Sequence, residues 1–236
     1  MKIAILSDIH GNIDAFKAVI DQMKKQKVDI VFSLGDHLGY YPEAIEVFDE
    51  IKKWDCHVIS GNHERIFLNF LKESKEYREN VIAKYGTSYL HYEKSFSDDL
   101  ITEISQFPDN KEVVVDGIKF LLCHGSPMDK DQYIYPDAEN VVLDDCDSKN
   151  CDFVFMGHTH YPMVYKGENT MIVNVGSIGQ ARTIGGIANW GIVNTKNKVY
   201  TPLSTPYDIS KLEERLKKNK EREYLYKILR RNNSTL

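Results

Sequence analysis

The chain has 236 residues, 42% of them hydrophobic and 28% charged, which is enough to bury a sizeable core within one large domain. Apolar runs such as 3–6 and 120–123 reach only four residues, far short of the roughly 20 that cross a bilayer, and Ser7, Asp8 and His10 interrupt the first run before a signal-peptide core could form. We therefore expect a cytoplasmic protein that does not bind a membrane. The net charge of -5 gives no general attraction for nucleic acid, so we expect no nucleic-acid partner.

The first sixty residues alternate between strand and helix patterns. Residues 2–7 and 28–34 are short apolar runs typical of strands. Between them, apolar residues of 12–25 recur at helical spacing, at Ile13, Phe16, Val19, Ile20 and Met23. A second helix pattern follows Pro42, and 57–60 are typical of a third strand. This order predicts an α/β fold with a parallel sheet.

In the middle of the chain, the spacing of the apolar residues changes. Residues 64–104 are rich in Glu, Lys, Tyr and Leu and poor in Gly and Pro, which predicts two or three helices over one face of the core. Short strand patterns separated by Gly, Asn and Asp turns follow, with one tight hairpin at Asp116-Gly117. The predicted strands are 113–115, 118–123, 153–156, 163–165, 171–175, 187–193 and 199–201.

The C-terminal residues form a distinct, highly charged segment. After Pro206, residues 208–231 alternate Leu, Tyr and Ile with many Lys, Arg and Glu. This pattern predicts a peripheral amphipathic helix, or a broken pair of helices, docked on the body rather than an arm for a partner. We therefore expect one domain over 1–205 and a charged helical extension over 206–236 packed on the same domain.

The four cysteines are Cys56, Cys123, Cys146 and Cys151, and none of them forms a Cys-x-x-Cys pair. So few cysteines in a chain of this length do not make a disulfide scaffold. We expect free thiols rather than disulfides or structural zinc.

Ionisable residues gather at the C-terminal ends of the predicted strands, where open α/β sheets present their ligand crevice. Three of five clusters have glycine directly before the polar residues and two have it directly after, which permits tight turns that aim several side chains at one spot. The clusters are Asp8-Ile9-His10, Gly35-Asp36, Gly61-Asn62-His63-Glu64, His124-Gly125 and Gly157-His158-Thr159-His160.

The candidate ligands are carboxylate, carboxamide and imidazole groups without a thiolate, a set that suits Mn²⁺, Fe²⁺, Zn²⁺, Ni²⁺ or Co²⁺ better than calcium. Seven candidates are too many for one tetrahedral zinc but enough for two ions that share a bridging carboxylate and leave room for water and substrate. We therefore expect a site for two divalent metal ions, built by Asp8, His10, Asp36, Asn62, His124, His158 and His160.

In this order, the motifs Asp-x-His, Gly-Asp, Gly-Asn-His-Glu, His and Gly-His-x-His resemble those of the calcineurin-like metallophosphoesterase superfamily. Residues 174–180, Asn-Val-Gly-Ser-Ile-Gly-Gln, resemble a glycine-rich segment of its small bacterial and archaeal phosphodiesterase branch. The resemblance extends over residues 1–205. It implies a four-layer α/β/β/α sandwich of the metallophosphoesterase type, with the metals at one edge of the central sheets and a peripheral C-terminal helix.

The resemblance also implies roles for single residues. Asp8, His10 and His160 hold the first metal, Asn62, His124 and His158 hold the second, and Asp36 bridges them. The metals acidify a shared water, and the bridging hydroxide attacks phosphorus in line. His63 faces the substrate and either protonates the leaving oxygen or, as imidazolium, stabilises the phosphoryl group. Some family members orient this histidine with an aspartate three residues after the bridging one, where this chain has Gly39.

Three further residues have candidate roles. Arg182 follows the glycine-rich segment and is either a phosphate contact or a structural arginine. We expect Asn12 to cap the first helix rather than to orient the metal loop. Tyr40 either packs in the core, which we favour, or flanks a pocket, and the same holds for Tyr41.

The sequence therefore predicts a binuclear metal-dependent phosphoesterase that acts on a small-molecule or nucleotide substrate, with a phosphodiesterase favoured. Within enzymes, the alternatives are a phosphomonoesterase and a nucleotide or protein phosphatase. The non-enzymatic alternative is a protein-binding scaffold like the related retromer subunit, which would be free to lose the ligands that this chain retains. The substrate depends on pocket walls from loops such as 39–43 and 128–137.

Overall fold

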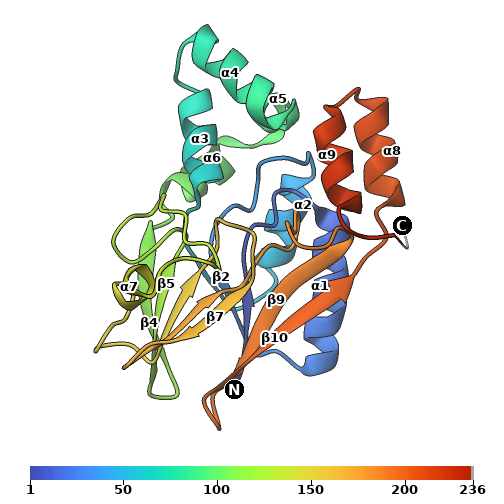
Figure 1. Cartoon of the computed structure of the whole chain (residues 1–236). Coiled ribbons are helices and arrows are strands. Elements are labelled where there is room, and N and C mark those ends of the chain that lie inside the picture. Colours follow the sequence, from blue (N-terminus) through green and yellow to red (C-terminus); the bar gives the residue numbers. More distant parts are fainter. Residues whose placement is uncertain (235–236) are drawn as a thin grey trace.

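The computed structural model describes residues 1–234 and has two mixed β-sheets with helices on both sides (Figure 1). The first sheet has the order β10-β9-β1-β2-β3 and consists of β1 (Lys2–Leu6), β2 (Ile30–Ser33), β3 (Cys56–Val58), β9 (Ile187–Asn194) and β10 (Val199–Pro206). The second has the order β4-β5-β6-β8-β7 and consists of β4 (Asn110–Val115), β5 (Ile118–Cys123), β6 (Phe153–Met156), β7 (Met163–Lys166) and β8 (Met171–Asn174). The α/β class and the sandwich implied by the resemblance are confirmed.

The first helix, α1 (Ile13–Gln26), connects two parallel strands, because β1 pairs with β2 at Ile3 and Ile30. Its apolar residues lie on one buried face, as their spacing predicted. The Asn12 side chain accepts a hydrogen bond from the Ala15 amide, so the predicted cap is confirmed. Helix α2 (Ala44–Ile51) then leads to β3.

Alternate residues of β1 build two different layers of core. Ile3 and Ile5 belong to the cluster between the two sheets, whereas Ala4 and Leu6 belong to the cluster beneath α1. This is the two-residue period of a strand buried on both faces. Each fully buried Ile side chain contributes roughly 1.5–3 kcal/mol, so a register slip would be costly.

Between β3 and β4 the chain leaves the sheets and forms a helical lobe, seen above the strands in Figure 1. The lobe consists of α3 (Asn62–Phe70), α4 (Lys75–Tyr85), α5 (Ser88–Ser95) and α6 (Asp98–Ser105). The prediction of two or three helices over residues 64–104 was therefore wrong, because the region forms four. The extra breaks have local causes, because Ser74 and Ser97 each cap a new helix and Gly86 has a φ of 95°.

The C-terminal segment forms two short helices and a 3₁₀ turn, α8 (Ser210–Lys218), α9 (Glu223–Lys227) and η1 (Ile228–Arg230). Leu212, Leu216 and Leu225 lie in the same core cluster as the buried face of α1. The short α7 (Asn140–Asp144) lies over the outer face of the second sheet. Among the helices of residues 1–234, none combines the length and hydropathy that a membrane crossing needs.

Candidate metal centre and substrate pocket

The predicted site residues lie in loops that follow the strands of both sheets. Strands β1, β2 and β3 run parallel, and so do β5 and β6, so within each sheet their carboxyl ends share an edge. Six of the predicted metal ligands are buried, and Asn62 is half-buried. The structure brings together Asp8 and His10 after β1, Asp36 after β2, Asn62 and His63 after β3, His124 after β5, and His158 and His160 after β6.

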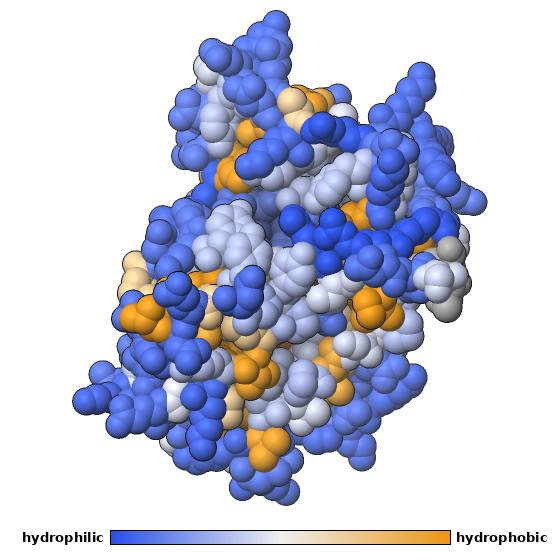
Figure 2. Space-filling model, viewed as in Figure 1, coloured by the Kyte–Doolittle hydropathy of each residue, from blue (hydrophilic) through white to orange (hydrophobic). Residues whose placement is uncertain are grey.

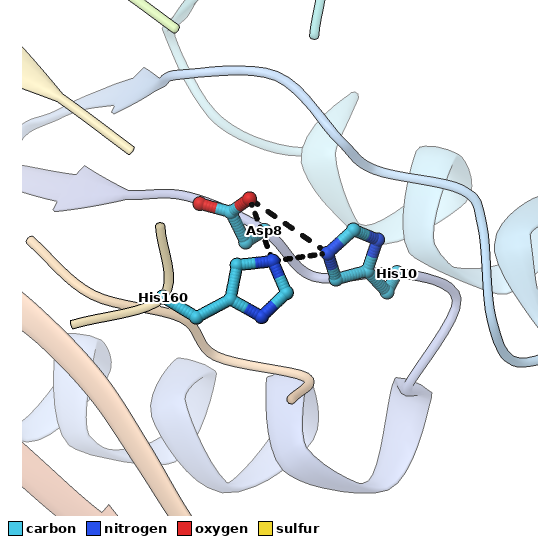
Figure 3. Close-up of side chains that lie close together, drawn as sticks. All are labelled: Asp8, His10 and His160. Carbon is cyan, nitrogen blue, oxygen red and sulfur yellow. Dashed lines mark hydrogen bonds and ion pairs between the residues drawn. The ribbon is translucent and has the colours of Figure 1, made fainter. Parts of the chain in front are cut away.

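A first group consists of Asp8, His10 and His160, whose side chains point toward one another (Figure 3). The Nε2 atoms of His10 and His160 are 3.0 Å apart. The Asp8 Oδ1 atom lies 3.7 Å from the first of these nitrogens and 3.3 Å from the second. The three candidate ligand atoms therefore surround one point.

A second group consists of Asp36, His124, His158 and Asn62. The His124 Nε2 atom lies 3.3 Å from Asp36 Oδ2 and 3.0 Å from Asn62 Oδ1. The same Asp36 oxygen is 3.9 Å from His10 Nε2 of the first group. Asp36 Oδ1 accepts the His63 backbone N–H at 2.7 Å, which fixes the carboxylate between the two groups.

Backbone carbonyls fix the tautomers of three histidines. His10 Nδ1 donates to Leu38 O at 3.2 Å, His124 Nδ1 to Leu34 O at 2.7 Å, and His160 Nδ1 to Gln180 O at 2.8 Å. Each neutral ring then carries a lone pair on Nε2, the atom that faces the site. Lone pairs of His10 and His160 thus face each other at 3.0 Å, an arrangement that a cation between them would stabilise.

Unpaired buried atoms and negative charge also fit a metal. Asp8 Oδ1 and His158 Nε2 are buried without a hydrogen-bond partner within residues 1–234. Burial alone would raise the pKa of Asp8 and Asp36, but the imidazoles of His160 and His124 hold each pKa below its usual range. Two carboxylates and several ring nitrogens converge here, so these residues fit divalent cations.

The loops that carry the site have an unusual backbone. Five site residues have positive φ angles between 54° and 67°, namely Asp8, His10, Asp36, His158 and His160. Such angles cost roughly 1–2 kcal/mol for a residue with a side chain, and they gather at functional sites. A Cβ on Gly61 would lie 2.2 Å from Asp36 Oδ1, and one on Gly157 would lie 2.0 Å from Ser7 Oγ. The glycines of the motifs therefore allow the loops to approach closely.

Glu64 is a buried positioning residue that the sequence analysis left without a role. Its carboxylate accepts the N–H groups of Asp36 at 2.9 Å, His37 at 2.7 Å and Gly61 at 2.8 Å. Burial would raise the pKa of Glu64, but the His37 imidazole at 3.1 Å and these donors keep that pKa low. One carboxylate thus ties the loop after β2 to the start of α3. Its place within the Gly-Asn-His-Glu motif was the available signal.

The glycine-rich segment 174–180 supports the metal loops. Asn174 Nδ2 donates to Gly157 O at 2.5 Å, and Ser177 Oγ donates to Asp8 O at 2.8 Å. Gln180 O accepts the ring proton of His160. The glycine-rich segment therefore has a structural role, because it holds the loops that carry Asp8 and His160.

Tyr89 takes the place beside His63 for which the sequence offered no candidate. Its hydroxyl oxygen is 2.6 Å from His63 Nδ1, and its side chain is fully buried. A Cβ on Gly39 would lie 2.6 Å from the same ring nitrogen, so a larger residue would collide with the histidine. Tyr89 lies 26 residues along the chain in a helical region, where no local pattern marks it.

A pocket of about 250 Å³ opens beside the metal residues. In Figure 2 the viewed face is hollowed below the helical lobe, and its hydrophobic patches are small and separate. The pocket is lined by Asp36, Tyr40, Asn62, His63, Lys84, Tyr85, Tyr133, Tyr135, His158, Thr159, His160 and Arg182. Tyr40 therefore both packs and lines the pocket, whereas Tyr41 is fully buried in the core. Lys84 and Tyr85 were missed, because they end a helix remote from every motif.

The family model of the calcineurin-like phosphoesterase superfamily domain matches residues 1–198. An uncharacterized protein of Methanocaldococcus jannaschii is 29% identical, with 94% of this chain and 95% of that protein covered. A phosphodiesterase of the same organism is 25% identical, with 74% of this chain and 96% of that protein covered. A crystal structure of a metallophosphoesterase from Sphaerobacter thermophilus has a TM-score of 0.79 and 22% identity, with coverage of 97% and 98%. A hypothetical protein from Pyrococcus horikoshii OT3 has a TM-score of 0.82 and 20% identity, with 97% of both chains covered.

Proposed function

Because the chain belongs to the calcineurin-like phosphoesterase superfamily and is a hydrolase acting on phosphoester bonds, we propose that it holds two divalent cations and favours phosphodiesters. Asp8, His10 and His160 would hold one cation, and Asn62, His124 and His158 the other. The observation that carries this proposal is the position of Asp36 Oδ2, 3.3 Å from His124 Nε2 and 3.9 Å from His10 Nε2. A carboxylate oxygen between two ligand groups is suited to bridge two ions.

The ligand set of oxygen and imidazole nitrogen favours Mn²⁺, Fe²⁺, Zn²⁺, Ni²⁺ or Co²⁺. When bound, such cations supply Lewis acidity that lowers the pKa of water and offsets charge on the phosphoryl oxygens. The chain's own residues fix the geometry, since the carbonyls on His10, His124 and His160 prevent their rings from turning.

His63 is the catalytic residue of this proposal. In its imidazolium form His63 donates from Nδ1 to the Tyr89 hydroxyl oxygen, and Nε2 gives its proton to the leaving oxygen, which leaves a neutral ring. The Asp36 carboxylate accepts the His63 backbone N–H, which positions the ring on the edge of the metal centre. Arg182 lines the same pocket, where its planar donors suit a phosphate or carboxylate group of the substrate.

The diester preference rests on a relative whose name is phosphodiesterase. A pocket of about 250 Å³ suits a small substrate or a nucleotide rather than a macromolecule. The four cysteines are free, and three of them are buried, which fits the reducing cytoplasm that we propose as its location.

The test is metal-dependent turnover. Chelated protein is resupplied with Mn²⁺, Ni²⁺, Co²⁺, Zn²⁺ or Mg²⁺, and hydrolysis of bis(p-nitrophenyl) phosphate is compared with that of p-nitrophenyl phosphate. In Asp36→Asn we expect turnover to fall by about a hundredfold or more and bound metal to decrease, because one carboxylate serves both ions. Asp21→Asn removes an exposed carboxylate on α1, outside the pocket, and is the matched control. Two bound ions and full turnover in Asp36→Asn would contradict the bridging assignment.

A further inference from the structure

The wall of the pocket carries two cationic side chains in addition to the candidate ligands. Lys84 ends helix α4 of the lobe, and Arg182 lies in the loop after the glycine-rich segment. Within residues 1–234, neither side chain forms an ion pair with a carboxylate. Of the residues that line the pocket, Asp36 alone has a carboxylate, so this wall is positively charged.

Two other arginines of the chain have a structural role, and each of them is paired with a carboxylate. Arg78 pairs with Glu93 through two nitrogens, at 2.7 and 2.6 Å. Arg230 pairs in the same forked way with Glu213, at 2.5 and 2.8 Å. Arg182 has no such partner, although it is partly buried and its Nε has no hydrogen-bond acceptor. A partly buried guanidinium without an anion beside it is stabilised by a ligand that supplies the missing acceptors.

The loop that carries Arg182 is anchored from outside the pocket. The Arg231 side chain donates to Arg182 O at 3.3 Å, and Asn232 Nδ2 donates to Thr183 O at 3.0 Å. The backbone is therefore held by the C-terminal residues, while the guanidinium remains available to the pocket.

Lys84 approaches the same space from the helical lobe. Its Nζ lies 4.9 Å from the centre of the Tyr85 ring, and that ring is 4.8 Å from the ring of His63. Tyr40 also contacts the His63 ring, at 4.9 Å. The cation thus lies on the side of the pocket where the proposed acid meets the leaving group.

The positive charge of the site exceeds what is needed to balance the single negative charge of a phosphodiester. Two divalent cations against the carboxylates of Asp8 and Asp36 already outweigh the single negative charge of a phosphodiester. Resting on the proposed function, we propose that Lys84 and Arg182 form a second anion subsite, which binds a non-scissile phosphate or carboxylate group of the substrate. The substrate class is then a phosphoester with a further anionic group, such as a phosphorylated nucleotide.

The test measures binding rather than turnover. Full-length, metal-loaded protein is titrated in a calorimeter with alkane diphosphonates from ethane to pentane, each against the monophosphonate of the same chain length. Phosphonocarboxylates of the same lengths separate a carboxylate from a phosphate as the second group. Because hydrogen bonds to charged groups are strong, we expect the best diphosphonate to bind at least roughly tenfold more tightly than its monophosphonate.

Variants assign this preference to the two cations. In Arg182→Gln we expect most of the preference to be lost, and in Lys84→Gln a few-fold loss, because exposed pairs are weaker. Arg182→Lys keeps the charge without the planar fork and retains part of the preference, which separates lost binding from misfolding. Lys75→Gln, on the same helix, and Arg222→Gln remove exposed cations outside the pocket and leave the preference intact.

Two outcomes would overturn the subsite. One is a wild-type protein that binds every diphosphonate no better than its monophosphonate, and the other is a preference that survives in both Arg182→Gln and Lys84→Gln. Turnover of bis(p-nitrophenyl) phosphate by the same preparations reports on the proposed function separately, because this substrate has no second anion.

Discussion

A tyrosine in the place of a carboxylate changes how His63 is held. Tyr89 O–H is neutral, since burial raises the pKa of its phenol well above the usual value. It orients the ring through one hydrogen bond of 2.6 Å but offers no negative charge to stabilise an imidazolium. Its contribution to catalysis is therefore one of positioning, and it acts through His63.

Leaving-group dependence distinguishes this positioning from simple packing. We expect His63→Ala to lower kcat by roughly 10²–10⁴ while metal stays bound, and Tyr89→Phe to lower it by roughly tenfold. Both losses are largest for alkyl leaving groups, which need a proton, and smallest for p-nitrophenolate. The measurement is kcat and KM over a series of aryl and alkyl diesters.

Tyr77→Phe removes a hydroxyl from a partly buried tyrosine on α4 and is the control, with no change in this series. A Tyr89→Phe loss of equal size for every leaving group would indicate that the hydroxyl only stabilises the fold.

Glu64 links stability to metal binding at a single residue. In Glu64→Gln an amide NH₂ replaces one of the oxygens that accept from Asp36, His37 and Gly61. Leaving buried N–H groups unpaired costs about 3 kcal/mol, and the loop that presents Asp36 loses its anchor. Urea unfolding and metal analysis check both effects, with Glu73→Gln as the exposed control. A variant with wild-type stability and metal content would show that the loop is fixed by other contacts.

At the scale of elements, strands were predicted best because each carries its own period. The predicted 118–123 and 153–156 coincide with β5 and β6, and Asp116 and Gly117 both have the positive φ angles of the expected tight turn. In contrast, β10 runs on to Pro206, beyond the predicted 199–201. It is paired along its whole length with β9, so tertiary pairing extends a strand that has weak local propensity.

The site was predictable to the extent that it lies within motifs. The seven expected ligands come together because parallel strands end at a common edge. Tyr89, Lys84 and Tyr85 lie in the helical lobe, and only the folding of that lobe over the sheet edge brings them to the pocket. They lie at no fixed spacing from the ligand motifs, so no pattern in the sequence indicates that they reach the pocket.

The C-terminal segment allows a prediction about elements. Leu216 of α8 is buried in the core cluster beneath α1, and Arg215 pairs with Asp14 of α1 and with Glu43. We expect Leu216→Ala to cost about 2–5 kcal/mol and to leave a single cooperative urea transition, because the segment packs on the same domain. Lys218→Ala is the exposed control. An early transition confined to the C-terminal segment would mean that it folds apart from the body.

For the whole molecule, the proposed metal centre lies where loops of the two sheets meet. Asp8, Asp36 and Asn62 come from loops of the first sheet, and His124 and His158 come from loops of the second. The hydrophobic cluster between the sheets holds them together along their length, whereas at this edge the contacts are between polar acceptors. We therefore expect metal binding to stabilise the pairing of the sheets as well as the site.

We consequently expect removal of metal to lower the thermal midpoint of the whole protein. At a free metal concentration of 100 Kd, binding contributes about 2.7 kcal/mol, which corresponds to a shift of roughly 5–10 °C for a domain of this size. Asp36→Asn reduces this shift. In the metal-free protein the His124 imidazole keeps the pKa of the Asp36 carboxyl low, and Asp36 in turn raises the pKa of His124 to about 9, so the variant loses this pair and its metal-free midpoint lies below that of the metal-free wild type.

With metal present, the wild type gains more stability than the variant, because the variant has lost the proposed bridging carboxylate. Calorimetric scans of both proteins, with and without chelator, check this difference in the metal-dependent shift. Parallel shifts in both proteins would contradict it, since they would mean that the metals bind without Asp36.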